Sequence, residues 1–317
     1  MKKIIMTAAL ILSILFLSSC NNEKIKVDIY TSIYPLEFVV KNIVKDEYVV
    51  RSVYPRGKDV HSYEVSPKDL MSMAESKIIF YIGLGVEWII EDSVNSTLAA
   101  VPTVSVIKNM TLIEINSDEV HHHHGDDEHT GIFFDPHVWL DPNRMKTITD
   151  NILEAMFEHL DLTEDQKNRF EENAEALKDK FGQLDAQFKE LISAPNIKSK
   201  TILIDHDAYA YWKEAYGIER IRIRTDNESV DVSPVEMQEK INAAKNLGIR
   251  HICVTKNEIP SSIINQYMSA LEIPNENKLE LHNLATITKE EEDKGENYFT
   301  LMEKNLRVLE KAFPKYD

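Results

Sequence analysis

Three histidines of this chain lie in short polar segments that could bind a ligand. They are His61 in Asp-Val-His-Ser-Tyr-Glu, His137 in Asp-Pro-His-Val-Trp-Leu-Asp-Pro and His206 in His-Asp-Ala-Tyr-Ala-Tyr-Trp. Neutral imidazole binds transition metals, and a carboxylate beside it can orient the ring. Imidazole suits zinc, whereas manganese prefers oxygen ligands. The three segments therefore predict a metal site, and zinc is the metal that fits it.

A second group of histidines lies in residues 119–130, among carboxylates and almost no apolar residues: His121, His122, His123, His124 and His129. Such a segment cannot pack against a core, so we expect a mobile loop. Imidazoles beside carboxylates in a flexible loop offer a weak, adaptable secondary metal site. An expression tag is an alternative interpretation, but tags lie at chain ends. A solvated loop without a function is left open.

Short apolar runs alternate with segments of helical spacing along most of the chain. The predicted strands cover 27–30, 48–50, 78–82, 104–106, 201–204, 218–223, 249–254 and 278–281. Strands that alternate with helices predict βαβ units and parallel sheets. His61, His137 and His206 fall in loops at strand ends or helix starts, which is where open α/β sheets bind their ligands.

The segment 163–194 predicts one long helix that ends before Pro195. Its apolar residues recur at alternating steps of four and three, namely Phe170, Ala174, Leu177, Phe181, Leu184, Phe188 and Leu191. About 30 helical residues span roughly 45 Å, the width of a whole domain. A core helix inside one lobe is the alternative. The length and the mid-chain position favour a rigid helix that joins two lobes, 25–162 and 195–317.

A faint internal repeat indicates that the two lobes are similar. Val-Ser-Pro-Lys-Asp-Leu at 65–70 matches Val-Ser-Pro-Val-Glu-Met at 232–237. Each has a serine at the N-cap, a proline at the first helical position and a carboxylate at the third. We therefore predict an α/β protein of two similar lobes with parallel sheets, joined by one long rigid helix.

The first twenty residues have the pattern of a secretory signal. Met-Lys-Lys is followed by an apolar run at 4–17, which is too short for a comfortable membrane span of about 20 residues. The run ends in Leu-Ser-Ser-Cys, which resembles the bacterial lipobox. We expect residues 1–20 to be a lipoprotein signal peptide, with the lipid on Cys20 anchoring the protein to a membrane outside the cytoplasm. An ordinary cleaved signal and a buried helix are the alternatives.

Composition narrows the possible functions further. The formal net charge of −17 excludes nucleic-acid binding by phosphate neutralisation and suits a cationic ligand. Cys253 is the only cysteine besides Cys20, so an acylated Cys20 leaves no intramolecular disulfide. Because Cys253 lies in an apolar run, we expect it to be a small buried core residue.

These segments resemble the metal-binding solute-binding proteins of bacterial ABC importers, and specifically their zinc branch. The resemblance rests on residues 59–64 with Ser66-Pro67, on 135–142, on 206–212 and on a His-rich insertion between the first two motifs. It implies a protein, not an enzyme, that binds Zn²⁺ in the cleft between its lobes through His61, His137 and His206. It also implies a monomer that delivers zinc to a permease in the cytoplasmic membrane.

The fourth ligand position departs from the pattern of that family. An aspartate is usual there, and the matching stretch Leu-Glu-Leu-His-Asn-Leu at 279–284 places His282 in its position. Glu280 and Glu258 are the competing candidates. Four ligands in a tetrahedron, including four imidazoles, are acceptable to zinc.

Three other functions are alternatives to zinc import. A manganese- or iron-binding subunit of the same importer class usually has a carboxylate at the third position, where this chain has His206. A surface adhesin that sequesters zinc without a transporter stays open. A zinc hydrolase would need a carboxylate base beside bound water, and the chain contains no His-Glu-x-x-His sequence.

Overall fold

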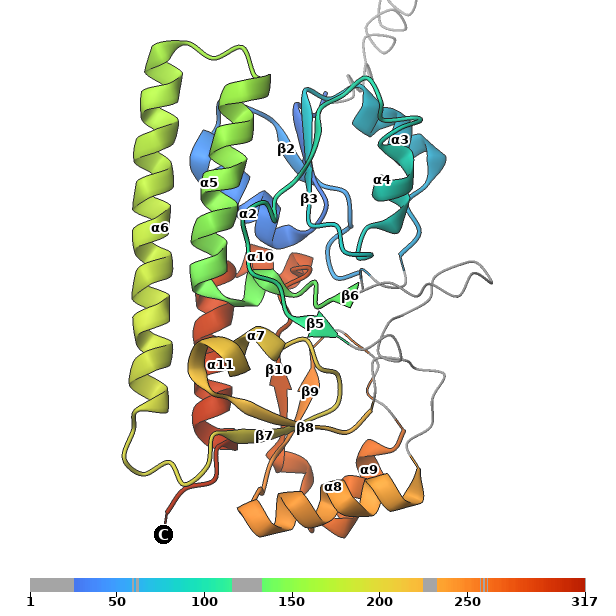
Figure 1. Cartoon of the computed structure of the whole chain (residues 1–317), viewed down its shortest axis with the longest axis vertical. Coiled ribbons are helices and arrows are strands. Elements are labelled where there is room, and N and C mark those ends of the chain that lie inside the picture. Colours follow the sequence, from blue (N-terminus) through green and yellow to red (C-terminus); the bar gives the residue numbers. More distant parts are fainter. Residues whose placement is uncertain are drawn as a thin grey trace, which may run out of the picture.

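The computed structural model describes residues 26–58, 60, 63–115, 133–224, 233–256, 258, 260 and 262–316. Two α/β lobes follow each other along the long axis, and one long helix runs beside both (Figure 1). The predicted fold class is confirmed. His61, the five histidines of the 119–130 segment and Cys20 lie outside the described residues.

The first lobe is built on a parallel sheet with the strand order β2-β1-β3-β4. Its strands are β1 (Ile29–Thr31), β2 (Val50–Ser52), β3 (Ile78–Tyr81) and β4 (Thr103–Ser105). The connecting helices are α2 (Tyr34–Val44), α3 (Pro67–Ala74) and α4 (Trp88–Ser93). Its two central strands, β1 and β3, are almost entirely buried, as parallel strands covered by helices require.

The second lobe repeats this topology. Its strands are β7 (Thr201–Ile204), β8 (Glu219–Arg222), β9 (Ile252–Thr255) and β10 (Lys278–Leu281), parallel in the order β10-β9-β7-β8. The helices between them are α7 (Ala210–Tyr216), α8 (Pro234–Leu247) and α9 (Ile264–Ala270), and the short helix η3 (Asn275–Asn277) precedes β10. In both sheets the first strand of the lobe therefore lies between the second and the third.

The repeated Ser-Pro motifs begin equivalent helices, α3 and α8, each between the second and third strands of its lobe. The Ser66 hydroxyl accepts from the Asp69 N–H at 3.2 Å, and the Ser233 hydroxyl accepts from the Glu236 N–H at 3.2 Å. Such caps satisfy backbone donors that have no partner inside the helix. The internal repeat is thus a repeat of structure.

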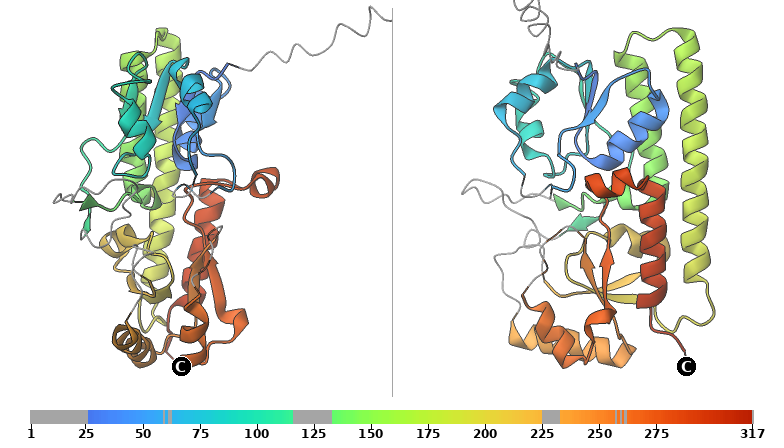
Figure 2. Two further views of the ribbon diagram at one scale, coloured as in Figure 1. Left: turned by 90° about the vertical axis from the view of Figure 1, so that its right-hand side faces the viewer. Right: turned by 180° about the vertical axis from the view of Figure 1, so that it is seen from behind.

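The long helix α6 (Glu164–Ile192) contacts both lobes through one apolar stripe. Near its start Phe170 lies against Tyr48 of the first lobe, with ring centroids 6.3 Å apart. Near its end Phe188 stacks on Tyr216 of the second lobe at 4.6 Å. The helix begins in a capping box at Thr163 and runs antiparallel to α5 (Pro142–His159), as Figure 2 shows from two further sides.

The remaining elements join the lobes or follow the second sheet. The strands β5 (Glu114–Ile115) and β6 (Phe133–Phe134) pair antiparallel, and the short helix η2 (Val138–Leu140) leads into α5. After β10 come α10 (Lys289–Asp293) and α11 (Tyr298–Ala312), and α11 packs against α6 (Figure 2). Among the helices of residues 26–316 that the structure describes, none is long and apolar enough to cross a membrane.

Candidate metal centre

His137 is held by the acidic residue two positions before it. Its ring Nδ1 lies 2.9 Å from Asp135 Oδ1, and the same oxygen accepts from the His137 backbone N–H at 2.8 Å. Both side chains are buried. Because an ionised carboxylate only accepts hydrogen bonds, Nδ1 carries the proton and Nε2 is the atom through which this ring would bind a metal.

His206 is held in the same way by a residue distant in the sequence. It lies two positions after β7, and Glu258 lies three positions after β9. The two strands are neighbours in the sheet, at the point where the strand order reverses, which is where open α/β sheets bind ligands. His206 Nδ1 is 2.7 Å from Glu258 Oε2, so its Nε2 is again the atom that would bind a metal.

Cationic neighbours keep Glu258 ionised. Burial raises the pKa of its carboxyl, but the hydrogen bond from His206 and the nearby charges of Arg224 and His137 outweigh burial and lower the pKa below its usual value. Arg224 Nη2 lies 3.4 Å from Glu258 Oε2. The site therefore contains a fixed negative charge that would offset a bound cation.

The two carboxylate–imidazole pairs come together where the lobes meet. The ring centroids of His137 and His206 are 5.8 Å apart and their planes cross at 75°. One pair comes from the chain before α6 and the other from the chain after it. Two buried imidazoles with their Nδ1 atoms occupied by carboxylates form a donor set suited to zinc. This arrangement fits the metal that the sequence predicts.

Aromatic residues after His206 tie its motif to that of His137. The Tyr211 hydroxyl donates to the Asp135 carbonyl at 2.7 Å, and Trp212 Nε1 donates to the Leu140 carbonyl at 2.8 Å. All four residues are buried. The second lobe therefore fixes the backbone that presents His137.

A third link between the lobes passes through Asn283, which follows β10. Its carbonyl accepts from Trp139 Nε1 at 2.7 Å, and its side-chain Nδ2 donates to Glu258 Oε1 at 2.9 Å. The other oxygen of Glu258 holds His206. The His137 motif, the end of β10 and the His206 ring therefore form one hydrogen-bonded chain.

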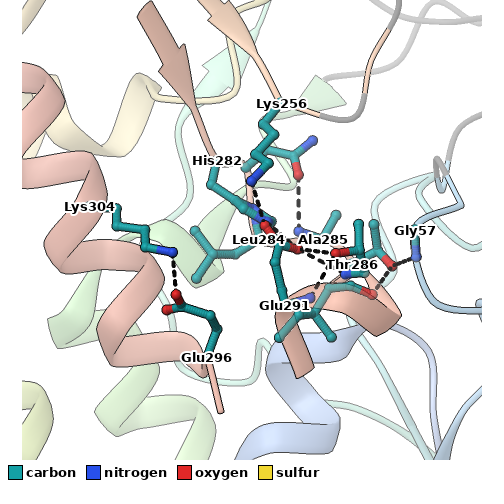
Figure 3. Close-up of polar contacts among 12 residues, drawn as sticks. Gly57, Lys256, His282, Leu284, Ala285, Thr286, Glu291, Glu296 and Lys304 are labelled. Atoms are coloured by element: carbon teal, nitrogen blue, oxygen red, sulfur yellow. Dashed lines mark hydrogen bonds and ion pairs between the residues drawn. The ribbon is translucent and has the colours of Figure 1, made fainter. Parts of the chain in front are cut away.

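His282 makes a different set of contacts, drawn in Figure 3. Its Nδ1 accepts from the Leu284 backbone N–H at 2.9 Å, and its Nε2 lies 3.5 Å from Glu291 Oε2. Lys256 Nζ reaches the other oxygen of Glu291 at 2.7 Å. Burial raises the pKa of Glu291, but nearby His282 and the hydrogen bonds of Lys256 and Thr288 prevail and hold that pKa well below its usual range.

That His282 completes the metal shell stays a prediction: its Nδ1 accepts from the backbone, and its buried Nε2 lies 3.5 Å from Glu291 Oε2 without a hydrogen-bond partner among the described residues. The competing candidate Glu280 is exposed on β10. Glu258 is the alternative that lies beside the imidazoles. Within the described ranges, which omit His61, no group of three or more His, Cys, Asp and Glu side chains is arranged to hold a metal.

The chain on both sides of His61 is described and well anchored. Before it, the Gly57 N–H donates to the Thr286 hydroxyl at 3.0 Å and to the Ile287 carbonyl at 3.0 Å (Figure 3). After it, the Tyr63 ring packs edge-on against Tyr54, with centroids 5.8 Å apart. The described residues on either side of His61 are therefore held in place.

Sequence reasoning missed the roles of Asn283 and Tyr211 and left Glu258 as one alternative among three. A signal for Glu258 was present, because it follows the predicted strand 249–254 closely and neighbouring parallel strands present their carboxyl ends at one edge. The hydrogen bonds of Asn283 and Tyr211 depend on how the lobes pack, which no local pattern encodes.

The chain is similar to proteins named for zinc binding and zinc uptake. The chain is 28% identical over 317 residues to zinc-binding lipoprotein AdcA of Streptococcus pneumoniae (strain ATCC BAA-255 / R6), covering 98% of this chain and 61% of that protein. It is 27% identical over 296 residues to the high-affinity zinc uptake system protein ZnuA of Bacillus subtilis (strain 168), covering 92% of this chain and 89% of that protein.

The crystal structure of the Zn(II)-bound ZnuA-like domain of Streptococcus pneumoniae AdcA superposes with a TM-score of 0.71 at 26% identity. The alignment covers 91% of this chain and 99% of that one. The family model ZnuA, described as zinc-uptake complex component A, periplasmic, matches residues 29–312. Since this match takes in both lobes and the connecting helix, the chain belongs to the ZnuA family of zinc-uptake components.

Proposed function

We propose that this protein captures Zn²⁺ outside the cytoplasmic membrane and delivers it to the permease of an ABC-type importer, without a catalytic role. The observation that carries the proposal is the pair of buried imidazoles, His137 and His206, 5.8 Å apart, each held at Nδ1 by a carboxylate. Relatives named for zinc binding and zinc uptake support it. The chain spans 61% of the length of AdcA, so the proposal concerns the part that they share.

The proposed zinc ligands are His61, His137 and His206, with Nε2 as the donor atom of the latter two. Glu258 fixes the ring of His206 and supplies negative charge beside the ion. His282 serves a different purpose, since it joins Glu291 to the backbone after β10. Three imidazoles and one further ligand satisfy the tetrahedral preference of zinc.

Capture and release would involve small shifts and not a wide hinge motion. The helix α6 packs on both lobes, and three hydrogen bonds from buried aromatic side chains cross between them near the site. Opening the lobes widely would break these bonds together. We infer that zinc enters and leaves through local rearrangement of the loops.

The protein would be a monomer attached through a lipid on Cys20, either in the periplasm or at the cell surface. The Leu-Ser-Ser-Cys sequence and the relative named as a lipoprotein support this anchor. The segment with His121–His124 and His129 would collect zinc near the cleft as a secondary site. Imidazoles beside carboxylates in such a segment bind metal weakly, so they would increase the amount of zinc bound and not the affinity of the cleft.

The test is zinc stoichiometry and affinity of the wild type beside His137→Ala, His206→Ala and His282→Ala. We expect the first two variants to bind zinc more than about 100-fold more weakly, because each removes a ligand atom. His282→Ala is the matched control, and its zinc affinity should stay close to that of the wild type. If His206→Ala kept wild-type affinity, the proposed site would be wrong.

Competition with manganese distinguishes the proposal from the related importer subunits for manganese or iron. An imidazole-dominated site should keep zinc in the presence of excess Mn²⁺, since manganese prefers oxygen ligands. Displacement of zinc by a comparable concentration of Mn²⁺ would assign the chain to those relatives instead.

A further inference from the structure

A basic hollow lies at the end of the second lobe that is farther from the first, close to the C-terminal end marked in Figure 1. It is a cavity of about 370 Å³ between the C-terminal ends of α8 and α11. Five of its eleven lining residues are basic, and none is acidic: the basic ones are Lys198, Arg250, His251, Lys311 and Lys315. The metal centre lies at the other end of this lobe's strands, so the basic hollow is a separate feature.

Its charge is unusual for a chain with a formal net charge of −17. In the part of the chain that the structure describes, none of the five basic side chains forms an ion pair with a carboxylate. Burial together with the charges of Lys311 and Lys315 lowers the pKa of His251. The basic groups therefore repel one another, and a bound anion would relieve that repulsion.

Helix dipoles account for only part of this cluster. Lys311 occupies the last turn of α11, and Lys198 Nζ lies beside Gly248, which ends α8. Cations at helix C-terminal ends are stabilising. Arg250, His251 and Lys315 lie outside helices, so the dipoles do not explain them.

The walls of the basic hollow are fixed by backbone contacts. The Lys198 N–H donates to the Pro314 carbonyl at 2.8 Å, and the Tyr316 N–H donates to the Asn196 carbonyl at 3.0 Å. Gly248 ends α8 in the left-handed conformation, with φ of 74°. The segments that carry the basic side chains are thus held in place before any ligand arrives, which lowers the entropic cost of binding.

We propose that the basic hollow binds a phosphate group, carried either by a small soluble phosphate compound or by a lipid headgroup. The guanidinium of Arg250 and the ammonium groups of the lysines supply charge-assisted donors of the kind that recognise phosphate. The exposed basic side chains make this a weak, salt-dependent site, with a dissociation constant on the order of 1 mM. It does not depend on zinc.

The test measures binding of inorganic phosphate and of glycerol 3-phosphate by calorimetry at constant ionic strength, with chloride as the competing anion. The variant Arg250→Gln/Lys315→Gln removes two charges from the basic hollow. The matched control Lys68→Gln/Lys180→Gln removes two exposed lysine charges elsewhere. We expect the first variant to bind phosphate about tenfold more weakly, and the control to bind within about twofold of the wild type.

A second arm identifies the source of the phosphate. Vesicles of phosphatidylglycerol are compared with vesicles of phosphatidylcholine in a sedimentation assay, using protein without its lipid anchor. Retention on the anionic vesicles that the double variant loses would assign a lipid headgroup, whereas binding of only the soluble phosphates would assign a soluble ligand. If none of these probes bound, or if both double variants lost binding equally, the proposal would be overturned. Zinc affinity should be unchanged in all cases.

Discussion

The two lobes have the same topology, but they treat the acidic residue after their third strand in opposite ways. After β3, Glu87 folds back, and its carboxyl accepts from the Ile82 N–H at 3.0 Å and the Gly83 N–H at 2.8 Å. The Glu87 side chain is fully buried. After β9, Glu258 contacts His206 and Asn283. One acidic residue closes its own loop, and the other reaches across to an imidazole.

The pKa shifts of the two carboxyls have opposite signs for a clear reason. Burial raises the pKa of Glu87 to about 7, even though the Ile82 and Gly83 N–H groups donate to its carboxyl. Burial also raises the pKa of Glu258, but there the cationic neighbours prevail and lower it. The shared scaffold alone therefore does not form a metal site, because the chemistry comes from the side chains placed on its loops.

The largest expected effect is on the pH dependence of stability. Glu87 binds its proton more tightly in the folded state, so the free energy of unfolding should fall as the pH rises from about 4.5 to above 7. The shift corresponds to about 3 kcal/mol. Glu87→Gln should lose this pH dependence. Its free energy of unfolding should therefore rise relative to that of the wild type as the pH rises. Denaturant unfolding of both proteins at pH 5 and pH 8 measures it.

Other ionisable groups contribute to both proteins equally, so the informative quantity is the difference between wild type and Glu87→Gln. If the difference in the free energy of unfolding stayed constant with pH, Glu87 would not be protonated in the native state. The contrast between the two lobes would then be wrong for Glu87. Zinc affinity of this variant should remain that of the wild type, since the carboxyl of Glu87 is bound by the backbone of its own loop.

The next effect concerns the acidic residue of the second lobe. Glu258 accepts from both His206 and Asn283, and a glutamine amide offers one oxygen for these two donors. Glu258→Gln should therefore weaken zinc binding by about 10- to 100-fold, as loss of a carboxylate that orients a histidine ligand does. Zinc titration against a chromophoric chelator measures this change.

Glu280→Gln is the matched control, because it makes the same change on an exposed side chain of the same lobe. If both variants bound zinc equally well, Glu258 would not orient His206, and the second lobe would contribute only a histidine.

A smaller effect is expected from the bonds that join the lobes. Tyr211→Phe removes the hydroxyl that donates to the Asp135 carbonyl at 2.7 Å. The buried carbonyl loses a partner, so the free energy of unfolding should fall by about 1 kcal/mol, with zinc affinity reduced only a few-fold. Tyr316→Phe, on an exposed tyrosine, is the control. No change in stability for Tyr211→Phe would mean that the lobes are held together without this bond.

Much of the fold could be predicted from the sequence because its signals are local. The apolar stripe from Phe170 to Leu191 predicts α6, and the paired Ser-Pro motifs predict the matched helices α3 and α8. His137 and His206 could be placed near each other because both lie in loops at the ends of elements. These features depend on spacing, capping and composition.

The contacts of the candidates for the fourth position could not be predicted, because they depend on packing between distant segments. His282 follows β10 as its position in the motif suggests, and its ring contacts the Leu284 N–H and Glu291 of α10. Glu258 reaches His206 across the 52 residues that separate them in the sequence. Whether a polar side chain faces the cleft is decided by such partners, and no local pattern records them.

The smallest expected effect separates the cleft from the histidine-rich segment. Deleting residues 121–129 should leave the affinity of the cleft for zinc within about twofold, because the imidazoles of His137 and His206 are held by Asp135 and Glu258, outside that segment. The total zinc bound at saturating metal should fall. Calorimetry with wild type and deletion variant resolves the two classes of site. A collapse of cleft affinity would instead mean that the first lobe supplies its ligands from the deleted segment, and that the carboxylate-held pair is insufficient.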